Sequence, residues 1–327
     1  MVRLACLFIS LGLVGCSSPA HSLPVSAEPA PVQLWQDASI FTLVNRRIES
    51  AHKRVLVEIY ELGRPDVVQA LGDAVARGLD VRVITDPTVP ESRQSVQRLD
   101  SLRVPERVYP IDDARHQIDH VKLLIADGEA TVGGMNWGTH SHRNHDYVLE
   151  TRIAGEVDRL VRIFEQDWSL AGGRPAPLAA AVGEIAQTAP GEEIRAMLRH
   201  ALLHAQRRVL AEVYTLTDPE VLADLVLAHR RGVDVRLLLD PNQSYNRHAF
   251  SVLRDAGVPV RWYPVPRSVK LHAKVGLFDG MLVLGSANWT ISGLGVNHEL
   301  DIETDDAGAV GAYVTRFGAD WERSGAS

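Results

Sequence analysis

The chain has almost no cysteine: of its 327 residues only Cys6 and Cys16 are cysteines, and both lie within the first sixteen positions. A disulfide or a cysteine-based metal site is therefore excluded from the rest of the chain. Stability must come from hydrophobic cores. The length is sufficient for two domains that each bury a core of their own.

The chain also lacks an excess of basic residues. It has 34 Lys and Arg against 41 Asp and Glu, which gives a net charge of −7. A protein that follows a nucleic-acid backbone needs a basic surface, so this balance disfavours a nucleic-acid partner. Hydrophobic residues make up 46% and charged residues 23%, which is typical of a soluble globular protein rather than a disordered one.

Near the N-terminus, the apolar run from Leu4 to Val14 follows a short positive start but is too short to span a membrane comfortably. It ends in Leu13-Val14-Gly15-Cys16-Ser17-Ser18, which resembles a bacterial lipobox. We therefore expect residues 1–15 to be a lipoprotein signal peptide and Cys16 to carry the lipid; an ordinary secretory signal is the alternative. Residues 16–31, rich in Pro, Ala and Ser, predict a flexible tether. The predicted location is the bacterial cell envelope, on a membrane anchor.

The remainder of the chain repeats itself. Arg54–Tyr60 matches Arg208–Tyr214, and the segment ending in Asp86-Pro87 matches the one ending in Asp240-Pro241. The offset between matching residues stays at 152 to 154 positions, from the early tyrosines to Trp168 and Trp321. A near-constant offset indicates duplication. We expect one repeat over 32–172, a linker over 173–177 and a second repeat over 178–327.

Each repeat shows the same order of elements. Helices are expected over Thr42–His52 and Ile194–Gln206, then a buried strand, then a helix that ends at Gly78 or Gly232. A second strand ends at Asp86 or Asp240, and another helix and short strand follow. Strands that alternate with helices in this way predict an α/β fold whose sheets are covered on both faces.

A doubled pattern of polar residues carries the chemistry. Each copy reads His-x-Lys-x4-Asp and is followed by Gly-x-x-Asn: His120, Lys122, Asp127 and Asn136 in the first, and His272, Lys274, Asp279 and Asn288 in the second. In an extended strand residues i and i+2 share a face, so each His is expected to point with its Lys. Asp-Gly predicts a hairpin turn that brings the glycines and the Asn back beside them. Glycine there lets the backbone approach a phosphate.

These residues resemble the signature of the phospholipase D superfamily, over roughly Val32 to the C-terminus. The second copy matches the signature fully, with Ser286 after Gly285; the first has Gly134 at that place, and Gly133-Gly134-Met135-Asn136 is similar to the first motif of cardiolipin synthases. The resemblance implies two α-β-α sandwich domains with mixed sheets, related by a pseudo-twofold axis, with one active site at their interface. It also implies a monomer with an internal pseudo-dimer.

The resemblance also implies roles for these residues. His120 would attack phosphorus to give a covalent phosphohistidine, and His272 would act as acid and base; the symmetry of the two copies leaves the reverse assignment open. Because the ordinary histidine pKa is near ~6.5, one neutral and one charged imidazole are expected around neutral pH. The lysines, with Asn136, Ser286 and Asn288, would hold the phosphate oxygens. Asp127 and Asp279, part of the catalytic motif, are expected to form turns and to brace the site.

Each histidine needs an acceptor for its second ring nitrogen. The resemblance implies that a carboxylate after a downstream Asn meets this need: Glu299 in Asn297-His298-Glu299, with Asp146 in Asn144-His145-Asp146 as its counterpart. For Asp146 a solvated loop acid is an equal alternative. The spacing of His140, His142 and His145 is not a zinc pattern, and the mechanism implied by the resemblance uses no metal, so neither a metal nor another cofactor is expected.

The sequence thus predicts a phospholipase D-type phosphodiesterase that cleaves or exchanges glycerophospholipid headgroups. The alternatives are a cardiolipin synthase-type phosphatidyltransferase, against which the lack of transmembrane helices counts, and a phosphodiesterase nuclease, which the acidic balance disfavours.

Overall fold

The computed structural model describes residues 30–174, 184–188 and 192–325. The predicted signal peptide, most of the tether and most of the linker lie outside these residues. The described residues from Pro31 onward belong to one compact unit. Within them, no helix is long and apolar enough to cross a membrane.

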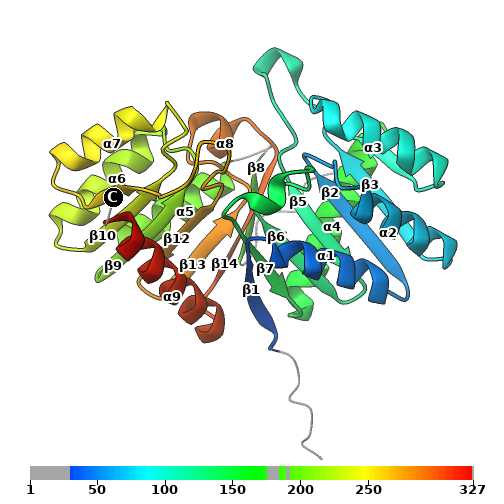
Figure 1. Cartoon of the computed structure of the whole chain (residues 1–327), viewed down its shortest axis with the longest axis horizontal. Coiled ribbons are helices and arrows are strands. Elements are labelled where there is room, and N and C mark those ends of the chain that lie inside the picture. Colours follow the sequence, from blue (N-terminus) through cyan, green and yellow to red (C-terminus); the bar gives the residue numbers. More distant parts are fainter. Residues whose placement is uncertain (1–29, 175–183, 189–191, 326–327) are drawn as a thin grey trace, which may run out of the picture. The chain divides into compact units, whose positions relative to one another are not determined.

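Two seven-stranded sheets organise the unit, one for each repeat (Figure 1). The first contains β1 (Val32–Gln36), β2 (Arg54–Ile59), β3 (Asp80–Thr85), β4 (Glu106–Val108), β5 (Lys122–Ala126), β6 (Glu129–Gly133) and β7 (Tyr147–Thr151). The second contains β8 (Ile185–Thr188), β9 (Arg208–Val213), β10 (Asp234–Leu239), β11 (Val260–Trp262), β12 (Lys274–Phe278), β13 (Met281–Gly285) and β14 (Glu299–Thr304).

The helices also occur in matching order. They are α1 (Ser39–Ser50), α2 (Pro65–Ala76), α3 (Pro90–Ser101) and α4 (Ala154–Ala171), then α5 (Glu193–His204), α6 (Pro219–Arg230), α7 (Asn246–Asp255), the short α8 (Ile291–Gly295) and α9 (Ala307–Ser324). Proline at the first position of α2, α3 and α6 suits a place where the missing N–H costs nothing.

The two sheets have the same topology. Their orders are β1-β7-β6-β5-β2-β3-β4 and β8-β14-β13-β12-β9-β10-β11. In each, the run from β2 to β4 or from β9 to β11 is parallel and the remaining pairs are antiparallel. Both sheets are therefore mixed, and the predicted duplication of an α/β fold is confirmed.

The helices form outer and inner layers. Apolar residues of α1, α2 and α3 pack on the outer face of the first sheet, and those of α5, α6 and α7 do the same on the second (Figure 1). The inner faces of both sheets share one core with α4 and α9. Because this core is common to both repeats, the ends of their strands are held in a fixed relation to each other.

The aspartates of the two Asp-Gly turns lie at the ends of the hairpins that point away from His120 and His272. Asp127 and Asp279 have φ of 52° and 56°, in the left-handed region that Asp tolerates. The Asp127 carboxylate accepts three backbone N–H bonds, from His52, Lys53 and Arg54, at 2.8 to 2.9 Å. It lies five residues beyond Lys122 along β5, at about 3.3 Å per residue. These aspartates brace the start of β2 and β9 rather than the histidines.

Asp127→Ala is expected to lower the free energy of unfolding by about 2 to 3 kcal/mol, because it leaves three N–H groups without a charged acceptor. Urea denaturation measures this. The turnover of the folded variant should stay within about twofold of wild type, since a brace at this distance leaves the histidines in place. Asp279→Ala, with contacts of 2.8 to 3.0 Å to the matching backbone groups, should behave in the same way. A loss of turnover without a loss of stability would show that the turns do reach the site.

Candidate active site

The two motif histidines lie where the repeats meet. The strands begin at Lys122 and Lys274, so His120 and His272 precede the strands instead of lying within them as the sequence predicts. The backbone N–H of His120 donates to the carbonyl of His298 at 2.8 Å, and that of His272 donates to the carbonyl of His145 at 2.7 Å. Each motif histidine is therefore fixed by a backbone group of the other repeat.

Each motif histidine also contacts a carboxylate of the other repeat. His120 Nδ1 lies 2.8 Å from Glu299 Oε2, and His272 Nδ1 lies 2.7 Å from Asp146 Oδ2. All four side chains are buried, and Asp146, at 1% exposure, is not a solvated loop residue. When Nδ1–H donates to the carboxylate, the lone pair of Nε2 is left for chemistry. The structure thus places each predicted acid beside the motif histidine of the other repeat.

Each motif lysine lies against its own histidine. Lys122 and Lys274 are 3% and 2% exposed, and each Nζ donates to the carbonyl of the histidine two residues before it. Lys274 Nζ also lies 3.2 Å from His272 Nε2. Burial lowers the pKa of Lys122 to about 7 and that of Lys274 to about 8. Two ammonium groups at this depth make a strong site for an anion.

Two tyrosines pack against the motif histidines. Tyr60 packs its ring edge against His120 with centroids 4.8 Å apart, and Tyr214 contacts His272 at 4.7 Å. Each ring also has a lysine Nζ 5.0 Å from its centroid. No role is predicted for these tyrosines from the sequence, although both belong to a repeated Glu-x-Tyr whose tyrosine directly follows β2 or β9.

The histidine pKa values depart from the expected one. Burial, opposed by Glu299 but reinforced by Lys122, lowers the pKa of His120 to about 4. Burial, Lys274 and Lys122 lower the pKa of His272 well below 6.5. The expectation of one neutral and one charged imidazole is therefore wrong for the ligand-free protein, in which both rings are neutral near pH 7. The main cause is the burial of the rings themselves, and the charge of the buried lysines adds to it.

The two acids are not equivalent. Burial would raise the pKa of Glu299, but His120 and Lys122 outweigh it, and the pKa lies below its ordinary value. Its Oε2 also accepts from the Ser286 hydroxyl at 2.6 Å. Burial instead raises the pKa of Asp146 to about 7, with Lys274 opposing. At neutral pH the Glu299 carboxylate is thus ionised, whereas the Asp146 carboxyl is protonated about half the time.

Gly134 accounts for part of this difference. It occupies the place of Ser286, so Asp146 has no hydroxyl donor like the one that Glu299 has. A Cβ on Gly134 would lie 2.4 Å from Asp146 Oδ1, which is far inside contact distance. The Asp146 carboxylate thus occupies the space that a side chain at position 134 would need. These glycines are predicted from the sequence to admit a phosphate; at Gly134 the structure shows a carboxylate in that space.

Gly134→Ser is expected to lower turnover by roughly 10- to 100-fold, because the new Cβ displaces Asp146 and with it the His272 ring. Initial rates on a phosphodiester substrate measure the loss. Gly128→Ser is the matched control, since a Cβ there meets nothing within 4 Å. Adding Asp146→Glu to Gly134→Ser would rebuild the Ser–Glu pair of the other repeat and should recover part of the rate. Full activity of the single variant would contradict this account.

Two of the three predicted phosphate-binding side chains are already engaged. The Asn136 amide donates to Glu61 Oε2 at 2.8 Å, and Ser286 donates to Glu299. The side-chain oxygens of Asn136 and Asn288 are buried and accept no hydrogen bond. Contact with a phosphate stays a prediction for these three residues; for Ser286 the geometry shows a second role, as the hydroxyl donor to Glu299.

Two further acids fix the segments that lead into the histidines. Asp86 Oδ2 accepts from the Asp119 N–H at 2.7 Å, and Asp240 Oδ2 accepts from the Leu271 N–H at 2.6 Å. Both carboxylates are at most 1% exposed. In the sequence, both belong to the Asp-Pro pair that directly follows β3 or β10. They hold the residue before each histidine, which limits how far the ring can move.

His140 and His142 are exposed, whereas His145 is buried elsewhere in the interface. Among the described residues, two buried groups have side chains that could ligate a metal: Glu58 with Asp167 and His298, and His145 with Glu212 and Asp320. Neither group contains a motif histidine or lysine.

A protein-family model described as "Cardiolipin synthase, PLD-like domain" matches residues 44–168 and again residues 198–321. The mitochondrial cardiolipin hydrolase of Xenopus laevis is 37% identical over 123 residues, which cover 37% of this chain and 58% of the relative. The cardiolipin synthase of Geobacillus thermodenitrificans is 26% identical over 321 residues, covering 85% of this chain and 63% of the relative. The chain thus spans little more than half the length of these curated relatives.

Solved structures share the fold. The phosphatidylserine synthase of Haemophilus influenzae Rd KW20 superposes with a TM-score of 0.70 at 13% identity, over 90% of this chain and 86% of that one. The polyphosphate kinase of Porphyromonas gingivalis gives 0.64 at 15% identity, over 88% of this chain and 46% of that one. At such identities the likeness concerns the fold alone. The two matched segments, which include both motif copies, show that the chain belongs to the phospholipase D superfamily, in the family of the cardiolipin synthase phospholipase D-like domain.

Proposed function

We propose that this protein is a phospholipase D-type phosphodiesterase that acts on glycerophospholipids through a phosphohistidine intermediate. The observation that carries the proposal is the pair of His–acid contacts exchanged between the repeats, His120 with Glu299 and His272 with Asp146, at 2.8 and 2.7 Å. One pair is anionic and the other carries a proton about half the time, which matches the needs of a nucleophile and of an acid.

In the first half-reaction, His120 Nε2 attacks phosphorus and the bond from phosphorus to the headgroup oxygen breaks. Glu299 accepts the Nδ1–H of His120 and stabilises the positive charge that forms on the ring. His272 gives a proton to the departing alkoxide, which leaves as an alcohol. Asp146 keeps that proton within the pair until the substrate arrives.

The substrate supplies the charge that the ligand-free site lacks. A phosphodiester anion between the Lys122 and Lys274 ammonium groups offsets the positive potential that lowers the pKa of His272. The proton shared with Asp146 then moves to the ring, where it reaches the leaving oxygen. The same ammonium groups stabilise the charge on the equatorial oxygens.

In the second half-reaction, water or an alcohol attacks phosphorus and gives its proton to the neutral His272. The bond between phosphorus and His120 Nε2 breaks, and the enzyme returns to its starting state. Water yields phosphatidic acid, whereas an alcohol yields a new phosphodiester. The chemistry of the two outcomes differs only in the acceptor.

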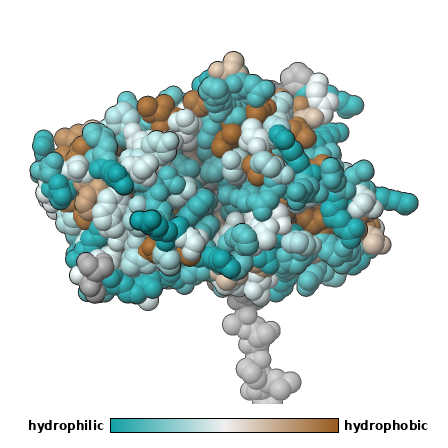
Figure 2. All heavy atoms as spheres, turned by 45° about the horizontal axis from the view of Figure 1, so that its top comes forward, coloured by the Kyte–Doolittle hydropathy of each residue, from teal (hydrophilic) through white to brown (hydrophobic). Residues whose placement is uncertain are grey.

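A phosphatidyl substrate is supported by the relatives, among them a cardiolipin hydrolase and a cardiolipin synthase. The space-filling view shows a mostly hydrophilic face on which apolar residues form small separate groups (Figure 2). Such a face suits contact with the headgroup layer of a membrane more than burial in its interior.

Cardiolipin synthase-type transfer is the second candidate. The family description and the synthase that aligns with 85% of the chain favour it, as does the Gly133-Gly134-Met135-Asn136 form of the first motif. In this reaction the acceptor is the hydroxyl of a second phosphatidylglycerol.

The test is turnover of phosphatidylcholine, phosphatidylglycerol and single-stranded DNA by the wild type, with His120→Ala as the blank. Release of choline or phosphatidic acid supports hydrolysis, and cardiolipin formed from phosphatidylglycerol supports transfer. Cleavage of DNA without turnover of either lipid would refute the proposal and favour the nuclease. Acid-labile, base-stable phosphate on the protein after quenching would identify the phosphohistidine.

We also propose that residues 1–15 are removed and that Cys16 carries a lipid anchor on a tether over 16–31. Cys16→Ser is expected to move the protein from the membrane pellet to the supernatant, because one or more acyl chains contribute about 0.8 kcal/mol per buried CH₂. Ultracentrifugation of the expressing cells' lysate measures the shift, and Cys6→Ser is the matched control. Unchanged pelleting of Cys16→Ser would refute the anchor.

A further inference from the structure

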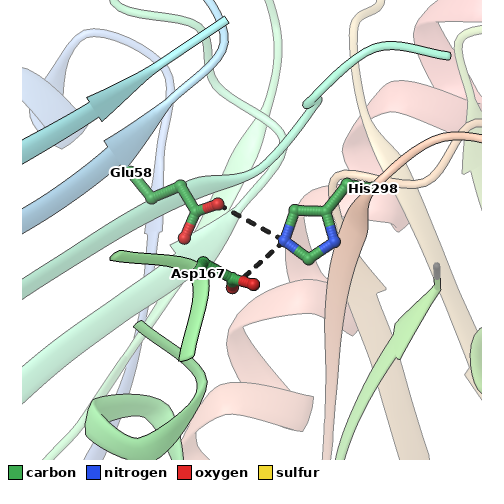
Figure 3. A group of neighbouring side chains, drawn as sticks. All are labelled: Glu58, Asp167 and His298. Carbon is green, nitrogen blue, oxygen red and sulfur yellow. Dashed lines mark hydrogen bonds and ion pairs between the residues drawn. The ribbon is translucent and has the colours of Figure 1, made fainter. Parts of the chain in front are cut away.

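Two buried clusters outside the motif residues cross between the repeats. In the first, here called the His298 cluster, His298 Nε2 lies 3.3 Å from Glu58 Oε1 and 3.2 Å from Asp167 Oδ2. Figure 3 shows both carboxylates directed at the same ring nitrogen. In the second, the His145 cluster, His145 Nε2 lies 3.4 Å from both Glu212 Oε2 and Asp320 Oδ2. In both clusters the histidine comes from one repeat and its two acids come from the other.

The clusters use the same repeat positions. Glu58 and Glu212 differ by 154 positions, and His145 and His298 differ by 153, as do Asp167 and Asp320. Each histidine ring also stacks on a tyrosine: His298 on Tyr109 at 4.5 Å and His145 on Tyr263 at 5.1 Å. A set of four residue types present twice, with the partners exchanged, indicates a device that the symmetric site uses twice.

Each cluster histidine connects two parts of one catalytic pair. The carbonyl of His298 accepts the backbone N–H of His120, and the next residue is Glu299, whose carboxylate binds the ring of His120. The carbonyl of His145 accepts the N–H of His272, and the next residue is Asp146. A shift of either cluster histidine would therefore move the backbone anchor and the partner acid of one motif histidine together.

Charge holds these rings in place. Burial opposes protonation, but Tyr109, Asp167 and Glu58 raise the pKa of His298 well above 6.5. For His145, Glu212 and Asp37 outweigh burial and raise the pKa to about 9. Both rings are thus imidazolium near neutral pH, in contrast to the motif histidines. A buried ion pair that loses one partner leaves an uncompensated charge, so the ring stays between its carboxylates.

Remaining contacts orient the rings further. His298 Nδ1–H donates to the carbonyl of Thr188 at 3.1 Å. On the other side, His145 Nδ1 lies 2.6 Å from Asp37 Oδ1, and Arg316 spans Asp37 and Asp320. With both ring nitrogens engaged, neither histidine is free to rotate. These contacts place the cluster histidines behind the site and not in contact with a substrate.

We propose that His298 and His145 are positioning residues, each clamped by two carboxylates of the opposite repeat, and that they set the orientation of His120 and His272 respectively. The inference rests on the proposed function. It adds a division of labour: the His298 cluster serves the nucleophile, and the His145 cluster serves the acid.

The test compares two leaving groups. His298→Gln and His145→Gln are each expected to lower kcat on phosphatidylglycerol by roughly 10- to 100-fold, with KM within about twofold, because the geometry of the reacting groups is lost and not the binding of substrate. On phosphatidyl-p-nitrophenol, whose leaving group departs without a proton, His145→Gln should regain most of the rate of the first half-reaction, seen as a burst of p-nitrophenol before the slower turnover in which His272 acts as the base. His298→Gln should stay slow, because attack by His120 is still needed.

A control variant separates positioning from loss of stability. Phe164→Leu changes a fully buried side chain of α4 that lies three residues before Asp167 and is not a member of either cluster, and its effect should be equal on the two substrates. If His298→Gln does not fold, Asp167→Asn tests the same cluster. Equal defects of both histidine variants on both substrates, or wild-type kcat for both, would overturn the proposal. One equivalent of bound metal in the purified protein would also overturn it, because the rings would then be ligands and not clamped imidazolium groups.

A second readout does not depend on activity. In protein labelled with ¹⁵N-histidine, the His120 ring should show Nδ1–H and a bare Nε2, and His298→Gln should change those signals while His145→Gln changes those of His272. Lack of lipid turnover by the wild type, with these spectral changes present, would refute the proposed function and leave the positioning intact. Unchanged spectra in an active enzyme would refute the positioning alone.

Discussion

His120→Ala is expected to lower kcat on phosphatidylglycerol by roughly 10⁴-fold or more, because it removes the nitrogen that forms the covalent intermediate. The loss should persist on phosphatidyl-p-nitrophenol, since a better leaving group does not replace a nucleophile. No phosphorylated protein should be trapped on quenching. Initial rates and labelling after an alkaline quench measure both.

His272→Ala is the matched variant for the other repeat. It should lose roughly 10²- to 10⁴-fold on the lipid alcohol ester, the usual contribution of a general acid. On the p-nitrophenyl ester the first half-reaction should survive, giving a burst of p-nitrophenol followed by slow release of the intermediate. A burst in His120→Ala and none in His272→Ala would reverse the assignment of the two histidines.

Glu299→Gln is expected to cost roughly 10²- to 10⁴-fold in kcat, because the amide neither stabilises the imidazolium that forms on His120 nor fixes its tautomer. Asp146→Asn should cost less, because it removes the proton that reaches the leaving group through His272 but leaves the attack by His120 intact. Steady-state kinetics at pH 7 on one phosphatidyl ester gives the ratio.

The pH dependence sharpens this comparison. The wild type should keep its activity down to the region where His120 gains a proton, near pH 4, and should lose it from about pH 7 upward as Asp146 and Lys122 lose theirs. Asp146→Asn should make the alkaline fall less steep, whereas Glu299→Gln should leave its slope unchanged. Equal losses in the two variants would show that the asymmetry between the acids has no catalytic weight.

Much of the fold could be predicted from the sequence because the duplication doubles every signal. The helices over Thr42–His52 and Ile194–Gln206 are confirmed with shifted boundaries, as α1 and α5, and the buried parallel strands are confirmed almost to the residue. The duplicated pattern does not predict the edge strand β1 or its counterpart β8. Their register depends on β7 and β14, which lie more than a hundred residues further along the chain.

The residues of the candidate site could be predicted from the sequence, but the contacts among them could not. Spacing identified His120 and His272, and the family pattern added Glu299 and Asp146, yet which acid meets which histidine depends on how the two repeats face each other. The neutral state of the histidines follows from the depth at which their rings are buried beside the two lysines, which spacing does not reveal. Asp127 shows the reverse case: its place in the motif suggested the site, whereas three backbone N–H groups hold it elsewhere.

The fit between Gly134 and Asp146 has a consequence for how such a gene diverges after duplication. A residue gained at position 134 is compatible only with a change at position 146, just as Ser286 is matched to the longer Glu299. Each matched pair lies within one copy but acts on the histidine of the other. With the proposed roles, selection on His272 as the acid is therefore recorded in the first copy, and His120 as the nucleophile is tuned by mutations in the second. Positions 134 and 146 should co-vary among homologues, as should 286 and 299, with little co-variation across the two copies.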